Sequence, residues 1–285
     1  MLWLAPAFLF ILGTCIGSFV NVAVLRFGFD ERSSPRSACM ACGHTLRARD
    51  LVPLFSYAAL RGRCRDCGSR LSPQYPLVEL ATGISFALAA PLIPATASLF
   101  PLLSFAALLV FLAALIGATA YDLRHTLVPL DFIWVLLAAA AVASLAQALA
   151  HGNPEPLIDS ALGGGAIFAF FFAVVFVTKG RGMGIGDGYV AGAGGIVLGF
   201  FRGIEAVMLA VWSATIVYLA LYAAAALSSA LRGGNRRSAK GQVTMKTEVP
   251  FVPFIAFGIL LGLFTTISPL EWGTAITAFV FSLHL

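Results

Sequence analysis

Long runs of apolar residues separated by short polar stretches dominate this sequence. The runs lack the alternating faces of soluble amphipathic helices, and they have the length of membrane-spanning helices. Eight runs of this kind cover residues 2–25, 76–93, 101–121, 129–150, 158–178, 188–201, 204–231 and 249–268. The pattern predicts an all-α polytopic membrane protein with about eight transmembrane helices. A further apolar tail, residues 273–285, is too short to cross a hydrocarbon core of about 30 Å alone.

Composition supports a membrane protein and excludes a soluble enzyme. The 285 residues are 60% hydrophobic and 11% charged, with a mean hydropathy of +0.93, whereas soluble domains carry about 25% charged residues. The net charge of +5 does not point to nucleic acid, because basic residues in a membrane protein mainly set its orientation. The first run has no basic residues ahead of it and is long for a signal peptide, so we expect a retained first helix.

The basic residues lie on one side of the predicted membrane. With the N-terminus outside, the cytoplasmic segments are 26–75, 122–128, 179–187 and 232–248, and they hold 9, 1, 2 and 5 Lys or Arg residues. These are 17 of the 18 basic residues, and only Arg202 is left outside. Because cytoplasmic loops are enriched in Lys and Arg, this orientation is the predicted one.

The first cytoplasmic segment contains two Cys-x-x-Cys-Gly motifs. Their cysteines are Cys39, Cys42, Cys64 and Cys67. Two such pairs are typical of a tetrahedral structural zinc site, and the glycine after each pair allows a left-handed turn. Disulfides or free thiols are the alternatives, and the reducing cytoplasm disfavours disulfides. The fifth cysteine, Cys15, lies in an apolar run, where we expect a small buried residue.

Two carboxylates lie at the cytoplasmic ends of predicted spans. Inserting an ionised Asp into the centre of a bilayer is unfavourable by roughly 2.5–3.5 kcal/mol, so such residues usually have a function. Asp122 ends the third span, and Asp187 follows Gly184 and Gly186 at the start of the short sixth span. Two acids held close share one proton, so one can activate water while the other protonates a leaving group. The pattern predicts an intramembrane aspartyl protease.

Alternatives exist for these acids. Taken singly, each Asp could flank a span or cap a helix. A carrier that relays protons through buried acids would explain the pair but not the cysteines. A membrane adaptor that docks assembly proteins through the cysteine segment is a third hypothesis.

The remaining acids have simpler interpretations. Asp131 suits the first turn of the fourth span, while Asp159 and Glu271 look like external boundary charges. Glu205 lies three residues after Arg202, close enough to pair with it on the outer side.

Together these residues resemble the type IV prepilin peptidase family. The similar stretches, in family order, are Gly17–Val22, the two cysteine pairs, Tyr75–Leu80, Asp122 followed by Pro129, the Gly-x-Gly-Asp of 184–187, and Lys246–Phe254. There are departures at two positions. Tyr189 stands where many relatives carry Lys, and Val252 replaces the Gly of a Pro-Phe-Gly-Pro stretch.

The resemblance implies a bacterial inner-membrane enzyme with Asp122 and Asp187 as catalytic residues. Such enzymes cut basic leaders from prepilins and pseudopilins on the cytoplasmic side, and members with the cysteine segment also methylate the new N-terminus with S-adenosylmethionine. Glu79 matches a family position, to which we assign a supporting role. The implied division is a first helix at 1–25, a cysteine domain associated with methyl transfer at 26–75, and a peptidase domain at 76–285.

Overall fold

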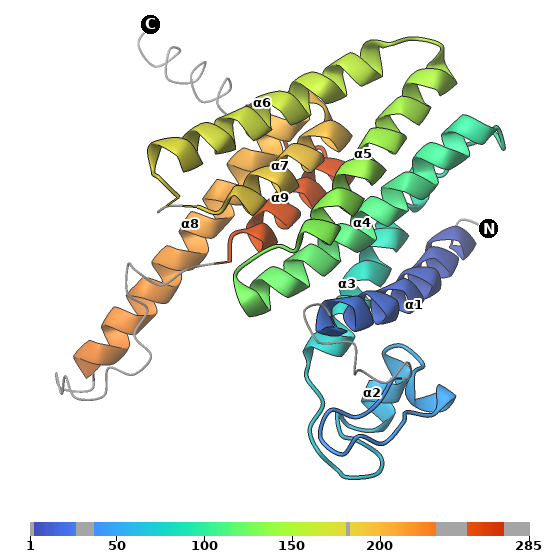
Figure 1. The fold of residues 1–285 in the computed structure, drawn as a ribbon, viewed down its shortest axis with the longest axis vertical. Coiled ribbons are helices and arrows are strands. Elements are labelled where there is room, and N and C mark those ends of the chain that lie inside the picture. Colours follow the sequence, from blue (N-terminus) through green and yellow to red (C-terminus); the bar gives the residue numbers. More distant parts are fainter. Residues whose placement is uncertain (1–2, 27–36, 181–182, 232–249, 271–285) are drawn as a thin grey trace, which may run out of the picture.

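The computed structural model describes residues 3–26, 37–180, 183–231 and 250–270. Its helices are α1 (Leu4–Arg26), α2 (Phe55–Ala59), α3 (Gln74–Leu88), α4 (Leu99–His125), α5 (Leu130–His151), α6 (Glu155–Val177), α7 (Ile185–Leu198), α8 (Phe200–Leu231) and α9 (Val252–Phe264) (Figure 1). Two 3₁₀ turns, η1 (Ala48–Asp50) and η2 (Ala90–Leu92), complete these elements. The described residues contain no β-strand beyond two isolated bridges, so the all-α prediction is confirmed.

Each predicted span corresponds to one helix, but the helices differ in length. Within the described residues, five are long and apolar enough to cross a membrane: α1, α4, α5, α6 and α8. The other three, α3, α7 and α9, have 15, 14 and 13 residues. At 1.5 Å per residue these are about 20–22 Å long, less than a hydrocarbon core of about 30 Å. The structure thus supports a multi-pass protein with five candidate spans, and a count of eight is not confirmed.

Two helix ends near the acids differ from the predicted span ends. The helix α4 continues to His125, past the predicted end at residue 121, so Asp122 lies within its last turn. The helix α7 begins at Ile185 rather than at 188, so Asp187 lies in its first turn instead of ahead of it. Hydrophobicity marks where apolar residues stop, whereas backbone hydrogen bonds carry a helix a turn further into polar sequence. The tail at 273–285 and Glu271 lie outside the described residues.

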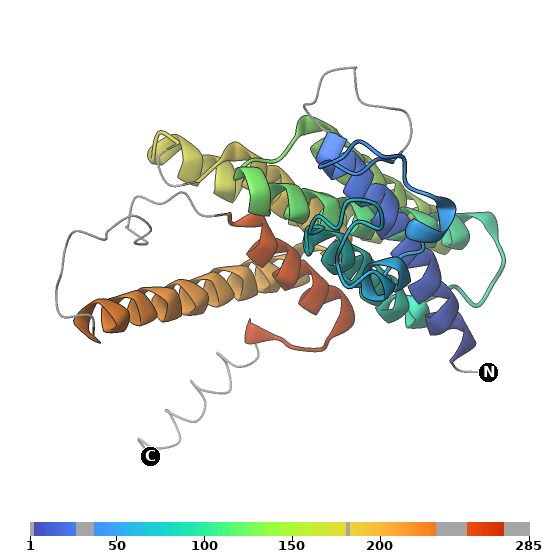
Figure 2. The same cartoon turned by 90° about the horizontal axis from the view of Figure 1, so that it is seen from below.

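The apolar core has two parts that share α4. One face of α4, including Phe111 and Leu115, packs with residues of α5, α6, α7, α8 and α9. Another face, including Leu112 and Ile116, packs with α1 and α3. The four-cysteine segment and α2 form a lobe below α1 and α3 in Figure 1, and α8 extends beyond the other helices in Figures 1 and 2.

Small residues bring α1 close to α3. A Cβ on Gly17 would lie 2.8 Å from Cα of Glu79, which is too near for any side chain. Gly13 faces α3 in the same way, one turn earlier. Cys15 and Phe19 therefore lie on the opposite side of the helix, and both are exposed. The prediction that Cys15 is buried was wrong, because its side of α1 points away from the core.

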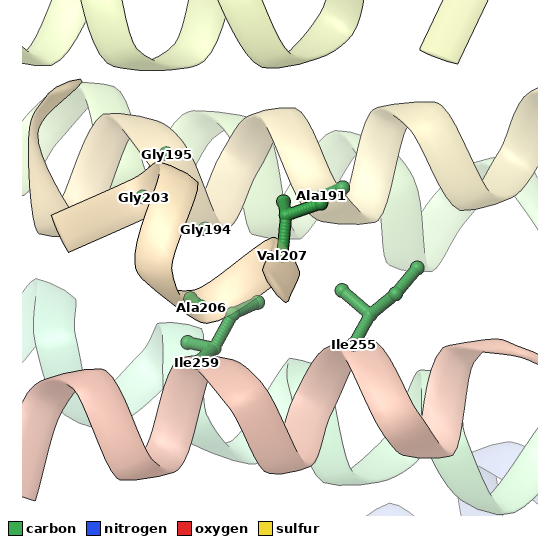
Figure 3. A pocket seen from close by; sticks show the side chains of 8 residues that line it. All are labelled: Ala191, Gly194, Gly195, Gly203, Ala206, Val207, Ile255 and Ile259. Carbon is green, nitrogen blue, oxygen red and sulfur yellow. The ribbon is translucent and has the colours of Figure 1, made fainter. Parts of the chain in front are cut away.

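A second crossing of small residues joins α7, α8 and α9. It leaves a small pocket lined by glycine, alanine, valine and isoleucine, with Gly194, Gly203 and Ile259 among the lining residues (Figure 3). None of the eight lining residues carries a titratable side chain. This pocket belongs to helix packing and does not contain the acids singled out in the sequence.

Candidate active site and metal centre

Asp122 is a buried acid whose carboxylate accepts a backbone hydrogen bond. Its side chain is 3% exposed. The amide of Val252, the first residue of α9, donates to Oδ2 of Asp122 at 3.2 Å. That amide belongs to the first turn of a helix, where N–H groups have no partner within the helix. A residue 130 positions away in sequence thus fixes the orientation of this carboxylate.

The turn between α4 and α5 keeps Asp122 at a helix end. Thr126 takes a left-handed conformation, with φ of 53°, and its amide donates to the carbonyl of Asp122 at 2.8 Å. Pro129 then precedes the first residue of α5 in an extended conformation. Proline disfavours helix in the residue before it, so the two helices cannot merge. Asp131 occupies the first turn of α5, as predicted.

Asp187 lies within range of the charge of Asp122. It is half-buried in the first turn of α7, and its amide donates to the carbonyl of Gly184 at 3.3 Å. The charge of Asp122 acts on it electrostatically. The start of a helix favours a negative group, which suits this position. The fold therefore brings together two acids from the end of α4 and the start of α7.

Packing does not require the glycines beside Asp187. A Cβ on Gly184 would meet no atom closer than Oδ2 of Asp187 at 3.8 Å, and one on Gly186 would meet Val128 at 3.5 Å. Both are ordinary van der Waals distances, so packing within the chain does not require glycine at either position. Glycine at these positions instead leaves the backbone beside the acid without side chains of its own.

Aromatic rings gather at the start of α9, the helix whose first amide donates to Asp122. The ring of Phe251 lies 6.5 Å from that of Phe171 and 6.4 Å from that of Phe254, measured between centroids. The ring centroid of Tyr218 in α8 lies 5.7 Å from that of Phe254. The charge of Asp122 also acts on the Tyr218 hydroxyl. Sequence reasoning missed both Tyr218 and the Val252 amide. For the Val252 amide, the one signal in the sequence was the resemblance of residues 246–254 to a stretch of the prepilin peptidase family.

The two cysteine motifs fold as similar knuckles. In the first, Cys39 donates its amide to the His44 carbonyl at 2.9 Å, and Gly43 donates to the Cys39 carbonyl at 2.8 Å. In the second, the equivalent bonds of Cys64 with Ser69 and of Gly68 with Cys64 measure 2.8 and 3.0 Å. Both glycines have φ of +70°, the left-handed turn that the sequence predicted.

The four thiols converge on one point. Their sulfurs, from Cys39, Cys42, Cys64 and Cys67, all lie within 4.8 Å of one another. The Sγ atoms of Cys39 and Cys67 are 3.9 Å apart. Four ligands at about 2.3 Å around a tetrahedral ion would stand about 3.8 Å from each other. The cysteines are therefore positioned to bind a metal ion, and no disulfide joins them.

Neighbouring groups support this centre. Burial opposes ionisation of Cys39, but hydrogen bonds from the backbone of Cys42 and Ala41 and from Ser69 lower its pKa to about 6. The backbone of His44 favours ionisation of Cys42, but burial and the thiols of Cys67 and Cys39 raise its pKa to about 11, so without a metal the thiols do not all ionise together. A thiolate is the form that binds metal. Asp50 accepts two hydrogen bonds from Arg65, at 2.8 and 2.7 Å, and this guanidinium lowers the pKa of the Asp50 carboxyl.

Glu79 lies apart from both centres. It is 6% exposed, and its Oε2 accepts the amide of Leu54 at 2.8 Å. Leu54 precedes α2 in the cysteine lobe, so the buried carboxylate links that lobe to α3. The predicted pairing of Glu205 with Arg202 is present, at 3.9 Å. Asp159, interpreted as a boundary charge, accepts the amide of Phe200.

These features define a class: a polytopic membrane protein that combines a buried and a half-buried acid with a four-cysteine lobe. Residues 11–92 match the Bacterial Peptidase A24 N-terminal domain, and residues 109–223 match the Type IV leader peptidase family. The chain belongs to this type IV leader peptidase family.

Curated relatives agree with this assignment. A prepilin leader peptidase/N-methyltransferase of Bacillus subtilis is 31% identical over 89% of this chain and 91% of its own length. One from Burkholderia pseudomallei is 33% identical over 88% of this chain and 82% of its own. One from Myxococcus xanthus is 36% identical over 66% of this chain, which matches about half (54%) of that protein. No solved structure matches. A proton-coupled carrier is not favoured by any of these relatives.

Proposed function

We propose that this protein cleaves the leader peptides of prepilins or pseudopilins with Asp122 and Asp187 as its catalytic residues. The observation that carries the proposal is that these two acids, 65 positions apart, lie at the end of α4 and the start of α7 within range of each other's charge. Relatives named as prepilin leader peptidases support the substrate class.

The chemistry needs only the two acids and a water molecule. Two carboxylates that act on each other share one proton between them when they are close. The ionised member takes a proton from water as the water oxygen attacks the scissile carbonyl carbon. The protonated member donates to the carbonyl oxygen, and a proton is passed to the amine as the C–N bond breaks. Val252 supports this cycle by holding Asp122 in one orientation.

We infer that the site faces the cytoplasm and that the N-terminus lies outside. The basic count over the loops supports this orientation, since 17 of 18 Lys and Arg residues are on the inner side. The backbone at Gly184 and Gly186, which carries no side chains, would let the backbone of a substrate approach, and the phenylalanines at the start of α9 would contact its apolar residues.

A second activity, N-methylation of the new N-terminus, is supported by the names of the relatives. We assign residues 26–75 to it and zinc to the four cysteines, whose sulfur spacing suits a tetrahedral ion. S-adenosylmethionine would be the methyl donor. The apolar pocket of Figure 3 does not fit that molecule, because its lining offers nothing to an adenine, a ribose or a sulfonium. We therefore derive no step through the donor.

The test of peptide cleavage uses the protein in lipid nanodiscs with a prepilin substrate. Asp122→Asn and Asp187→Asn should each abolish cleavage, since general acid–base groups contribute about 10²–10⁴-fold each. The matched control is Asp131→Asn, an exposed Asp in the first turn of α5, which should retain the wild-type rate. Cleavage by Asp187→Asn at more than a few per cent of the wild-type rate would contradict the proposal. Metal analysis of the purified protein tests the zinc assignment.

A further inference from the structure

Glu79 is a buried carboxylate that the cleavage reaction does not use. It sits in the first half of α3, 6% exposed, where Gly17 lets α1 approach its backbone. Burying a carboxylate is unfavourable unless its oxygens accept hydrogen bonds. Here Oε2 accepts the amide of Leu54 at 2.8 Å, and the Ser18 hydroxyl also interacts with the carboxylate. Both α1 and the cysteine lobe therefore contribute to its surroundings.

The residue that Glu79 holds is strained. Leu54 has φ of 60° and ψ of −48°. The amide of Phe55 donates to the carbonyl of Pro53 at 2.6 Å, so residues 53–55 form a γ-turn with positive φ. This turn is rare and unfavourable for a residue with a side chain. Strain of this kind persists only where surrounding contacts hold it, and it tends to occur where position matters.

The strained turn stands between the helices and the metal centre. It leads directly into α2, Phe55–Ala59, and α2 leads into the knuckle of Cys64. At that junction the amide of Gly62 donates to the carbonyl of Tyr57, and the amide of Leu71 donates to the carbonyl of Gly62. Leu54 is thus connected to the second knuckle through α2 and these two hydrogen bonds.

We propose that Glu79 is a positioning residue that fastens the cysteine lobe to α1 and α3 by holding the strained turn at Leu54. This fastening serves methyl transfer, a role that depends on the function proposed above for residues 26–75. In the described part of the chain no hydrogen bond joins Glu79 or Leu54 to Asp122 or Asp187, so we expect leader cleavage not to require the fastening.

Hydrogen–deuterium exchange on the full-length, metal-loaded protein in nanodiscs tests the contact itself. Glu79→Ala should speed exchange of the amides of 54–59 at least tenfold. Glu79→Gln keeps a neutral oxygen acceptor, so it should give an intermediate rate and keeps the test usable if the alanine variant fails to insert. The matched control is Glu205→Ala, which removes a carboxylate of similar burial, 5% exposed, from the start of α8. It should leave exchange at 54–59 unchanged.

Activity assays on the same samples test the role of the contact. Methyl transfer to a pre-cleaved peptide should fall at least tenfold in Glu79→Ala, with metal content unchanged and leader cleavage within twofold of wild type. Glu79→Gln should recover most of the methyl transfer. Unchanged exchange at 54–59 would overturn the fastening, and unchanged methyl transfer with faster exchange would overturn its role. Equal loss of cleavage and methylation would also overturn it. Absence of methylation by the wild-type protein would instead refute the proposed function and leave the exchange result standing.

Discussion

Replacing the peptide bond between Phe251 and Val252 by an ester should slow leader cleavage about ten- to a hundredfold. The ester has oxygen in place of the N–H that donates to Oδ2 of Asp122 at 3.2 Å. Both partners are buried, with Val252 at 0% and Asp122 at 3% exposure, so water cannot replace the lost donor. A hydrogen bond to a charged group contributes about 1.5–3 kcal/mol. Since about 1.4 kcal/mol is a factor of ten in rate, this loss gives the stated range.

The ester also weakens the preceding carbonyl as an acceptor, so the control must share this effect. The carbonyl of Phe251 accepts from the amides of Phe254 and Ile255 in α9. An ester between Pro129 and Leu130 is the matched variant, because Leu130 is likewise the first residue of a helix and the Pro129 carbonyl accepts from Ile133. The variant with this ester should cleave the leader at a rate within about twofold of the wild-type rate.

The assay is single-turnover cleavage of a prepilin peptide by protein translated in vitro with α-hydroxy acids and inserted into nanodiscs. Single-turnover conditions separate the chemical step from product release. Thermal unfolding of each variant is measured beside it, so that a loss of rate can be distinguished from a loss of folded protein. If the two esters slow cleavage equally, or if the Val252 ester acts at the wild-type rate, then the Val252 amide does not position Asp122 for catalysis.

Two further predictions concern stability. Gly258→Ala should lower the free energy of unfolding by about 1–3 kcal/mol, because its Cβ would overlap the Ala206 carbonyl of α8. Gly165→Ala, in open space on α6, should raise it by roughly 0.5–1 kcal/mol, and equal shifts in thermal unfolding would contradict this packing. Asp50→Asn should destabilise the cysteine lobe at neutral pH, as measured by hydrogen exchange. Arg65 lowers the folded pKa of Asp50, so its contribution is complete above the unfolded pKa of about 3.9 and disappears as pH falls through the lower folded value. If the difference in hydrogen exchange between Asp50→Asn and wild type stays constant as the pH is lowered through the folded pKa of Asp50, this linkage is refuted.

The sequence predicted the order of the helices well because the apolar runs are long and separated by Pro, Gly and charge. It predicted the ends of those helices less well. Asp122 and Asp187 fall inside α4 and α7, since polar residues at a helix end still make backbone hydrogen bonds. The left-handed glycines at 43 and 68 were predictable, because a Cys-x-x-Cys-Gly knuckle needs that conformation.

Other features of the site had no sequence signal of their own. The donor to Asp122 is a backbone amide, which every residue except proline has, so no residue type could reveal it. Cys15 looked like a core residue by its apolar neighbours, and only the pairing of α1 with α3 shows which side of the helix is exposed. The strained turn at Leu54 is held by Glu79, 25 positions later in the chain. No local sequence pattern predicts this turn.

The division of the core bears on how the two proposed activities are related. Asp122 belongs to α4, the helix that packs into both parts of the core. Described contacts near it include a bond from Arg124 to the Gln74 side chain at the start of α3. At 3.3 Å and exposed, that bond is a weak link. The Glu79 carboxylate, which is buried and bonded at 2.8 Å, is a much stronger one, but it joins the lobe to α3 and not to α4. Movement of the cysteine lobe should therefore disturb α1 and α3 before it reaches the acids, which is why we expect methyl transfer to be lost while cleavage continues.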